Sequence, residues 1–167
     1  MITLKNSVGR VLLAGLIYML AITLPFMLMF GYLIGFIAGV CAGIVFTIIM
    51  IIINARNIRI GTKEAQKISE TKKILCNGSA ESVMGKIFGN AGWLMLCEDE
   101  IIFKSNKFNF DNRSITIPLE RIKNLTVKSR KFVVECIDKT FTFNVVDAKQ
   151  WREITHNHIV AKMNGAQ

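Results

Sequence analysis

The first third of this chain contains almost no charge. From Val11 to Ala55 there are 45 consecutive residues without an acidic or basic side chain, and residues 1–61 contain no Asp or Glu. A helix crosses the roughly 30 Å hydrocarbon core of a bilayer with about 20 apolar residues. The uncharged run is therefore too long for one crossing and is long enough for two crossings joined by a tight turn.

The lack of charge also excludes several membrane functions. Because no ionisable side chain lies inside the run, a proton relay, an ion pathway or a transport site has no residue to support it. We predict helices over about 8–29 and 32–54, with Pro25 and the aromatic residues from Phe26 to Tyr32 marking the turn. Pro25 alternatively kinks the last turn of the first helix. We interpret residues 1–58 as a transmembrane hairpin that anchors the protein.

Basic residues flank the uncharged run on both sides. Two precede it and four follow it closely: Lys5, Arg10, Arg56, Arg59, Lys63 and Lys67. Positive charge is enriched in the cytoplasmic segments next to transmembrane helices. We therefore expect an integral membrane protein whose two termini and soluble part are cytoplasmic.

Glycine recurs every four residues within the second predicted helix. The four glycines fall on one stripe: Gly31, Gly35, Gly39 and Gly43. In lipid, small residues let two helices approach closely. Two interpretations stay open. The stripe packs on Gly15 and Ala14 of the first helix, or it acts as a glycine zipper that joins copies of the chain into a homo-oligomer.

Cysteine and histidine are few and scattered. The four cysteines form no CxxC or Cys/His pattern, which predicts free thiols in a reducing compartment: Cys41, Cys76, Cys97 and Cys136. His156 and His158 lie two residues apart on a predicted helix, so their side chains point away from each other and cannot share a metal. We expect no metal and no cofactor.

Motifs for catalysis are also missing. The sequence contains no Ser/His/Asp set, no glycine-rich phosphate loop with its lysine and no H-E-x-x-H pattern. We therefore expect a protein that is not an enzyme.

The rest of the chain has the composition of a soluble domain. Of the net charge of +9, residues 1–61 contribute +4, and residues 62–167, with 17 basic and 12 acidic side chains, contribute +5. A moderately basic domain suits an anionic membrane surface. Nucleic acid would suit the charge too, but a chain tethered to a membrane makes it the weaker choice, and we expect no nucleic-acid partner.

The soluble part begins with a charged segment and continues as short alternating runs. We predict a helical linker over 59–73 and strands over about 81–88, 92–98, 100–105, 114–118, 122–128, 132–138 and 140–146. Asp147 is the expected N-cap of a final helix with Trp151, Ile154, His158 and Ala161 near one face. The prediction is an α+β chain in which the hairpin precedes a bent antiparallel β-barrel over 74–167, plugged by the C-terminal helix.

Several segments follow one ordered pattern. Residues 92–96 and 101–105 match "G-x-L-x-L-T-x-x-x-L-x-F", and residues 107–110 with 117–122 match "F-x-I-P-L-x-x-I". Residues 141–145 and Trp151 fit the last strand and helix of the same pattern. This set resembles the GRAM domain of the pleckstrin-homology-like (PH-like) superfamily over about residues 74–160, and it departs at Cys97 and Glu98. The resemblance implies seven strands in two nearly orthogonal sheets, a helix closing one end, and non-catalytic binding of lipids or proteins.

Two basic segments are the candidate lipid-binding and membrane-binding sites. The first interleaves cations with aromatic rings: Lys104, Lys107, Phe108, Phe110 and Arg113. The second is one predicted hairpin, with Lys123 nearby: Lys128, Arg130 and Lys131. Cations attract anionic headgroups at about 1 kcal/mol each near a surface, and exposed Phe can enter the interfacial layer. Alternatively, the rings pack into the barrel and the cations are ordinary solvated charge.

Two functions follow from these observations. The first is a membrane-anchored module whose PH-like domain binds the membrane surface or anionic lipid. The alternative is a protein-interaction adaptor, or a regulatory subunit of a membrane complex, that is homo-oligomeric through the glycine stripe.

Overall fold

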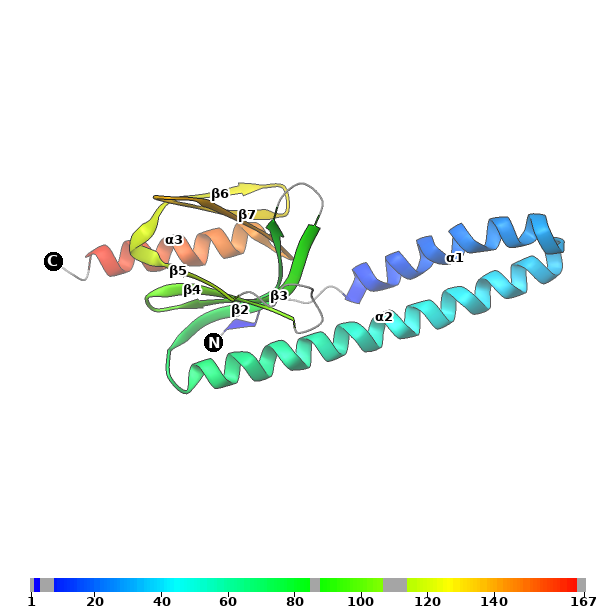
Figure 1. Ribbon diagram of the computed structural model, residues 1–167, viewed down its shortest axis with the longest axis horizontal. Helices are drawn as coiled ribbons and strands as arrows, with labels where there is room; N and C mark the ends of the chain where they lie inside the picture. The colour runs from blue at the N-terminus through cyan, green and yellow to red at the C-terminus, as the bar shows by residue number, and fades with distance from the viewer. Residues whose placement is uncertain (1, 4–7, 85–87, 107–113, 165–167) are drawn as a thin grey trace. The chain divides into compact units, whose positions relative to one another are not determined.

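The computed structural model describes residues 2–3, 8–84, 88–106 and 114–164 (Figure 1). The chain divides into two compact units. Ser7–Ile58 form one, which we call the helical hairpin, and Arg59–Gln167 form the other together with the N-terminal residues. We call the second the sheet unit.

The helical hairpin consists of α1 (Val8–Phe30) and the first part of α2 (Tyr32–Ser69). Both helices are long and apolar enough to cross a membrane by length and composition, and only 6% and 11% of their apolar windows are buried. The break between the helices falls between Phe30 and Tyr32, close to the predicted bounds, and Pro25 lies inside α1, several residues before the turn. The turn is Gly31, whose φ of +83° lies in the left-handed region that glycine enters without a steric penalty.

The glycine stripe faces the other helix of the same hairpin. A methyl group added at each of four glycines would collide with the facing helix: Gly35 with Met27, Gly39 with Thr23, Gly43 with Met19, and Gly15 with Thr47. Gly31 has nothing within 4 Å of an added methyl group, so it serves the turn and not the helix packing that we expected of it. The other stripe glycines therefore let α1 and α2 approach closely.

The sheet unit is built from antiparallel strands. Their bounds are β2 (Ile74–Met84), β3 (Phe88–Cys97), β4 (Glu100–Ser105), β5 (Ser114–Pro118), β6 (Ile122–Lys128), β7 (Lys131–Cys136) and β8 (Thr140–Val145). Their hydrogen-bonded order is β5-β4-β3-β2-β8-β7-β6. Among the described strands this path is open, because β5 and β6 lie at its two ends, so hydrogen bonds do not close the bent β-barrel that we predicted. The 3-10 turn η1 (Leu119–Arg121), directly after Pro118 at the end of β5, separates these two strands.

Strand β2 begins seven residues before its predicted start and has partners along both edges. Its whole length pairs with β3, from Ile74 opposite Cys97 to Met84 opposite Phe88. Its other edge pairs with β8 at residues 80–82 and, in parallel, with the short strand β1 (Ile2–Thr3). The sequence did not predict β1.

The core lies between the sheet and α3 (Ala148–Asn164). Trp151 of α3 is 1% exposed, and its ring centroid lies 6.1 Å from that of Phe132. The backbone N–H of Gln150 donates to the Asp147 side chain over 3.0 Å, which confirms Asp147 as the N-cap. The predicted buried face of the helix is confirmed at Trp151, whereas Ala161 is exposed.

The opposite face of β3 and β4 is buried as well. Trp93, Met95 and Ile102 alternate with the core residues and yet are at most 7% exposed. The last part of α2 covers Trp93, because a methyl group added at Gly61 would collide with its indole ring. The segment predicted as a linker is thus the continuation of α2 to Ser69, packed on the sheet.

Candidate functional site

The β6–β7 hairpin brings three of the predicted cations together. Lys128 lies opposite Lys131 in the register, so Ser129 and Arg130 form a two-residue turn. Ser129 has a φ of 59°, and positive φ is what such tight turns require at this position. Lys128, Arg130 and Lys131 are all exposed, and we call them the basic tip.

The basic tip has no acidic partner among the described residues. The ion pairs among the described residues are formed by other cations: Lys67, Lys72, Lys73, Lys104, Arg121 and Lys162. Like charges directly opposite one another on two strands are destabilising, as Lys128 and Lys131 are here. A bound anion would relieve this repulsion.

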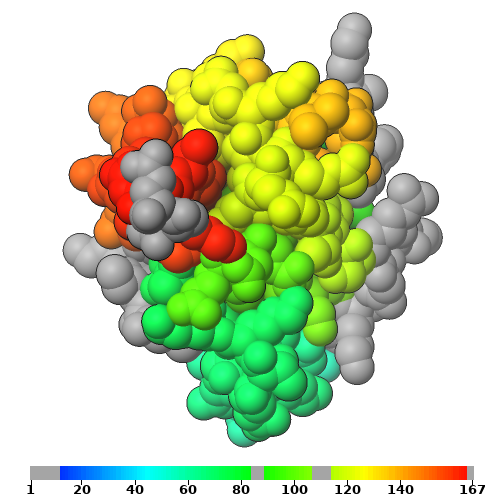
Figure 2. Space-filling view, turned by 90° about the vertical axis from the view of Figure 1, so that its left-hand side faces the viewer, coloured from blue at the N-terminus to red at the C-terminus, as the bar shows by residue number. Residues whose placement is uncertain are grey.

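A groove of about 700 Å³ lies beside the basic tip, between β6 and α3. We call it the β6–α3 groove, and it is lined by Asn124, Leu125, Thr126, Val127, Ser129, Lys149, Arg152, Glu153, His156 and Asn157. In Figure 2, α3 in orange and red lies beside the yellow surface of the chain segment that contains β6. Arg152 donates from Nε to the Leu125 carbonyl oxygen over 3.1 Å, and the buried Thr126 hydroxyl has no hydrogen-bond partner among the described residues.

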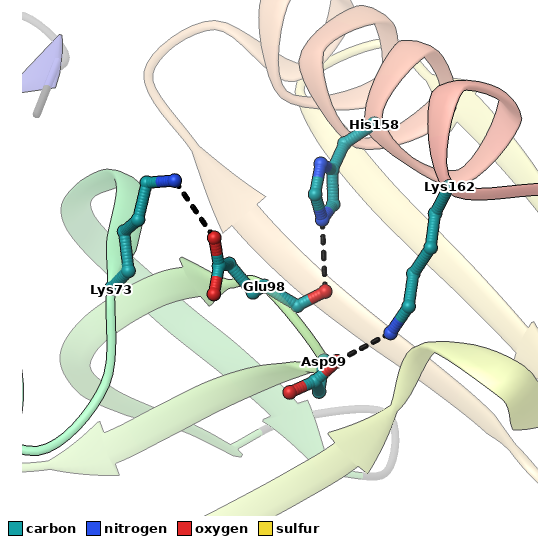
Figure 3. A network of polar contacts seen from close by, with 5 residues as sticks. All are labelled: Lys73, Glu98, Asp99, His158 and Lys162. Carbon is teal, nitrogen blue, oxygen red and sulfur yellow. Dashed lines mark hydrogen bonds and ion pairs between the residues drawn. The ribbon is translucent and has the colours of Figure 1, made fainter. Parts of the chain in front are cut away.

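The turn between β3 and β4 has the opposite charge. Lys73 donates to the Glu98 carboxylate over 2.8 Å, Lys162 pairs with Asp99, and His158 Nε2 lies 2.9 Å from the Glu98 carbonyl oxygen (Figure 3). The hydrogen bond and charge of Lys162 lower the pKa of Asp99, and the hydrogen bond of Glu98 raises the pKa of Lys73. We call Glu98 and Asp99, with these partners, the clamped turn.

The two histidines have different surroundings. His158 contacts the clamped turn, whereas His156 lines the β6–α3 groove. Within the described ranges, no group of three or more His, Cys, Asp or Glu side chains is arranged to hold a metal ion.

The first predicted basic segment lies largely outside the described residues, which exclude Lys107, Phe108, Phe110 and Arg113. Lys104 is described, and its ammonium lies 3.3 Å from the Glu64 carboxylate of α2. Partial burial raises the pKa of Glu64, but the hydrogen bonds and charges of Lys104 and Lys67 together outweigh it, so the pKa of Glu64 is lowered. The charge of Lys104 is therefore engaged within the sheet unit.

The cysteines are free thiols in the structure, as predicted. Burial raises the pKa of Cys76 to about 12 and that of Cys97 to about 11. Because the thiolate is the reactive form, these two side chains act as small apolar residues of the sheet.

The β6–α3 groove has no signal in the sequence. Lys149 and Arg152 look like ordinary surface charge on an amphipathic helix, and nothing local says that they face a strand edge. Their proximity to β6 depends on the position of β6 at the end of the strand order.

No protein-family model and no curated protein matches the chain. Among solved structures, it is similar to the N-terminal PH domain of human ARAP2, with 22% identity, 55% of this chain and 84% of that chain covered, and a TM-score of 0.45. It is also similar to the Vps36 N-terminal PH domain, with 13% identity, coverage of 57% and 84%, and a TM-score of 0.47. A third is the C-terminal domain of an unknown protein from Leishmania infantum, with 15% identity, coverage of 62% and 99%, and a TM-score of 0.49.

PH domains are thus among the structural neighbours of this chain. The seven described antiparallel strands on this path and the single C-terminal helix agree in number and order with what the sequence resemblance implies, but hydrogen bonds join the strands in one ladder and not in two separate sheets. Similarity at these identities carries no ligand from those proteins to this chain.

Proposed function

We propose that this protein is a membrane-anchored binding module without catalytic activity. The helical hairpin spans a membrane, and the sheet unit, a GRAM-type PH-like domain, binds anionic lipid headgroups through the basic tip. The GRAM assignment rests on the ordered residues from Gly92 to Trp151, whose described segments fall in β3, β4, β5, β8 and α3.

Membrane anchoring is supported by the exposed apolar surface of the helical hairpin. Large apolar side chains cover both helices and are not buried by protein, including Leu20, Leu24 and Leu28 at 62%, 69% and 80% exposed. Apolar surface on this scale favours lipid over water. The glycine contacts close α1 onto α2, so they support a hairpin that is complete in one copy.

The pairing of β1 with β2 supports a hairpin whose two ends lie on the same side of the membrane. Because β1 precedes the helical hairpin and β2 follows it, their pairing keeps both ends of the hairpin on one side of the membrane. The basic residues that flank the hairpin favour the cytoplasmic side. We propose that the sheet unit is cytoplasmic.

The observation that carries the lipid proposal is the unpaired basic tip. Three exposed cations on a fixed two-residue turn, two of them directly opposed, have no acidic partner among the described residues. Each cation near an anionic surface contributes about 1 kcal/mol. Together they would strengthen binding to an anionic membrane by about two orders of magnitude.

The test uses the full chain in nanodiscs made with and without phosphatidylserine. Hydrogen exchange of residues 122–136 should slow when the anionic lipid is present. The triple variant Lys128→Gln, Arg130→Gln, Lys131→Gln should abolish that protection. A control with the same loss of charge elsewhere, Lys63→Gln, Lys139→Gln, Lys162→Gln, should retain it. Equal exchange in the two lipids, or equal loss in the control, would overturn the proposal.

A protein-interaction adaptor, or regulatory subunit of a membrane complex, is the second candidate. The observation that favours it is the β6–α3 groove, which offers a strand edge and cations at one place.

A further inference from the structure

We propose that the part of α2 that belongs to the sheet unit binds an acidic helix of a partner protein anchored in the same membrane. The binding surface consists of three exposed cations, which we call the basic ridge: Arg59, Lys63 and Lys67. This interaction rests on the membrane anchoring proposed above, and it is separate from the engagement of lipid by the basic tip.

One face of this part of α2 packs on the sheet. A methyl group added at Gly61 would collide with the indole ring of Trp93, and Ala65 is 0% exposed. Each residue turns an α-helix by about 100°, so Lys63 lies about 200° from both Gly61 and Ala65. Lys63 is therefore on the face of α2 that points away from the sheet.

The basic ridge is a single row of like charges. Its members are four residues apart, and residues at this spacing lie one above the other on one face of a helix. No acidic residue lies in the row, since α2 ends at Ser69, before Glu70. Cations at this spacing repel each other and weaken a helix. The row therefore does not serve the stability of α2.

The cations of the basic ridge have little acidic compensation. None of the ion pairs among the described residues includes Arg59 or Lys63. The Lys67 ammonium lies 3.6 Å from the Glu64 carboxylate, but the Lys104 ammonium lies 3.3 Å from the same carboxylate. Because one carboxylate serves two lysines, the ridge keeps a net positive charge that an acidic partner would neutralise.

The position of the ridge along α2 favours a protein over the membrane surface. With Ala55 as the end of the hydrocarbon core, Lys67 lies about 18 Å further along the helix axis. The headgroup region extends only about 6 Å beyond that core, and the average helix tilt is about 20°. The far end of the ridge is then about 11 Å above the headgroups, beyond the Debye length of about 8 Å at physiological ionic strength.

The membrane also determines the shape of the partner. A single segment crosses a bilayer as a helix, because lipid offers no hydrogen-bond partners to the backbone. Where such a helix continues beside α2, carboxylates at every fourth residue rise by about 6 Å each, as the cations of the ridge do. Charged pairs between neighbouring helices set partner choice in coiled coils. A second copy that presents the same ridge does not fit, because its charge is the same.

The probe is a model membrane helix of about 20 leucines, continued beyond the membrane by a helical segment with glutamate at every fourth position. It is reconstituted with the full chain in nanodiscs without anionic lipid. A photoreactive benzoylphenylalanine replaces Gln66, an exposed residue beside the ridge. A second probe has the same composition, with its glutamates spread evenly around the helix. The first probe should cross-link about tenfold more efficiently than the second.

Variants of the protein locate the binding. One variant removes the ridge and should lower cross-linking of the first probe to the level of the second: Arg59→Gln, Lys63→Gln, Lys67→Gln. A control loses the same charge at exposed positions elsewhere in the sheet unit and should leave cross-linking unchanged: Lys123→Gln, Lys139→Gln, Lys149→Gln. Recovery of the full chain in nanodiscs by size exclusion reports the anchoring separately.

Three outcomes would overturn the proposal. The first is equal cross-linking of the two probes, a comparison that holds even if the ridge variant perturbs α2. The second is an equal loss in the control variant, which would show capture by net charge. The third is displacement of the first probe by soluble dihexanoyl phosphatidylserine, which would identify the ridge as a site for lipid headgroups.

Discussion

The clamped turn and the basic tip are two β-turns of the same sheet, and both are dense in charge. In the clamped turn the two carboxylates have lysine partners supplied by the segment before β2 and by α3. In the basic tip, two lysines face one another, and none of the ion pairs among the described residues includes them. The comparison teaches that pairing, and not the number of charges, separates a structural charge from one that is available to a ligand.

Helix α3 connects the two regions. Arg152 lies at the β6–α3 groove, and Lys162 pairs with the clamped turn. Ten residues of helix separate these side chains by about 15 Å along the axis. One helix therefore positions residues of both regions.

The largest expected effect comes from removing the Trp151 side chain, which packs α3 against the core. Trp151→Ala deletes a fully buried ring from the core and should lower the free energy of unfolding by about 3–5 kcal/mol. Hydrogen exchange of the full chain in denaturant should show faster exchange at both the clamped turn and the basic tip. Met163→Ala, at an exposed position of the same helix, is the control. Faster exchange at one region only would show that α3 does not couple them.

The next change gives the basic tip the charge pattern of the clamped turn. Arg130→Glu places a carboxylate between Lys128 and Lys131 and changes the local charge by two. Binding to anionic membranes should weaken by about 2 kcal/mol, or about thirtyfold. Lys139→Glu makes the same charge change at the β7–β8 turn and should have a smaller effect in a vesicle-binding measurement. Equal effects would show that net charge alone decides binding.

Lowering the pH should destabilise the clamped turn and not the basic tip. Lys162 lowers the pKa of Asp99 below its ordinary value of 3.8, so this contact stabilises the fold above that value and is lost as pH falls through the lowered pKa. Hydrogen exchange at residues 97–100 and 158–164, corrected for the pH dependence of intrinsic exchange, should accelerate in this range. The basic tip contains no carboxylate, and an equal acceleration there would contradict the assignment.

The smallest expected effect comes from Lys162→Gln. Both partners of this ion pair are on the surface, where such pairs contribute little to global stability. Thermal unfolding should be nearly unchanged, and faster exchange should be confined to the clamped turn and the end of α3. The exposed substitution Lys149→Gln, near the start of the same helix, should leave exchange at the clamped turn unchanged. A large drop in the unfolding temperature would show that the clamp supports the whole fold.

Much of the fold could be predicted because it depends on local pattern. β4 to β8 follow alternation and turn residues closely, and Asp147 marks the start of α3, whereas β3 begins four residues before its predicted start. The early part of β2 was missed because Asn77, Gly78 and Ser79 look like a turn, whereas pairing with β3 makes them a strand. β1 was missed because two residues carry no periodicity, and their pairing depends on a strand far along the chain.

The candidate site was harder to predict for the same reason. The basic tip follows from sequence because Lys128, Arg130 and Lys131 are neighbours in one hairpin. The β6–α3 groove brings together residues that are close in space but distant in sequence, such as Thr126 and Arg152. The partner of Lys104 was missed because the linker segment was not expected to pack on the sheet.

The pairing of β1 with β2 also has a consequence for biogenesis. Residues 2–3 are made before the helical hairpin, but their partner strand is made after it. The loop between them can close only when the whole hairpin has been synthesised, and such distant pairings form late because closing a long loop costs entropy. A cysteine cross-link between residue 3 and β2 would therefore report the moment at which the hairpin has been synthesised and β2 has joined β1.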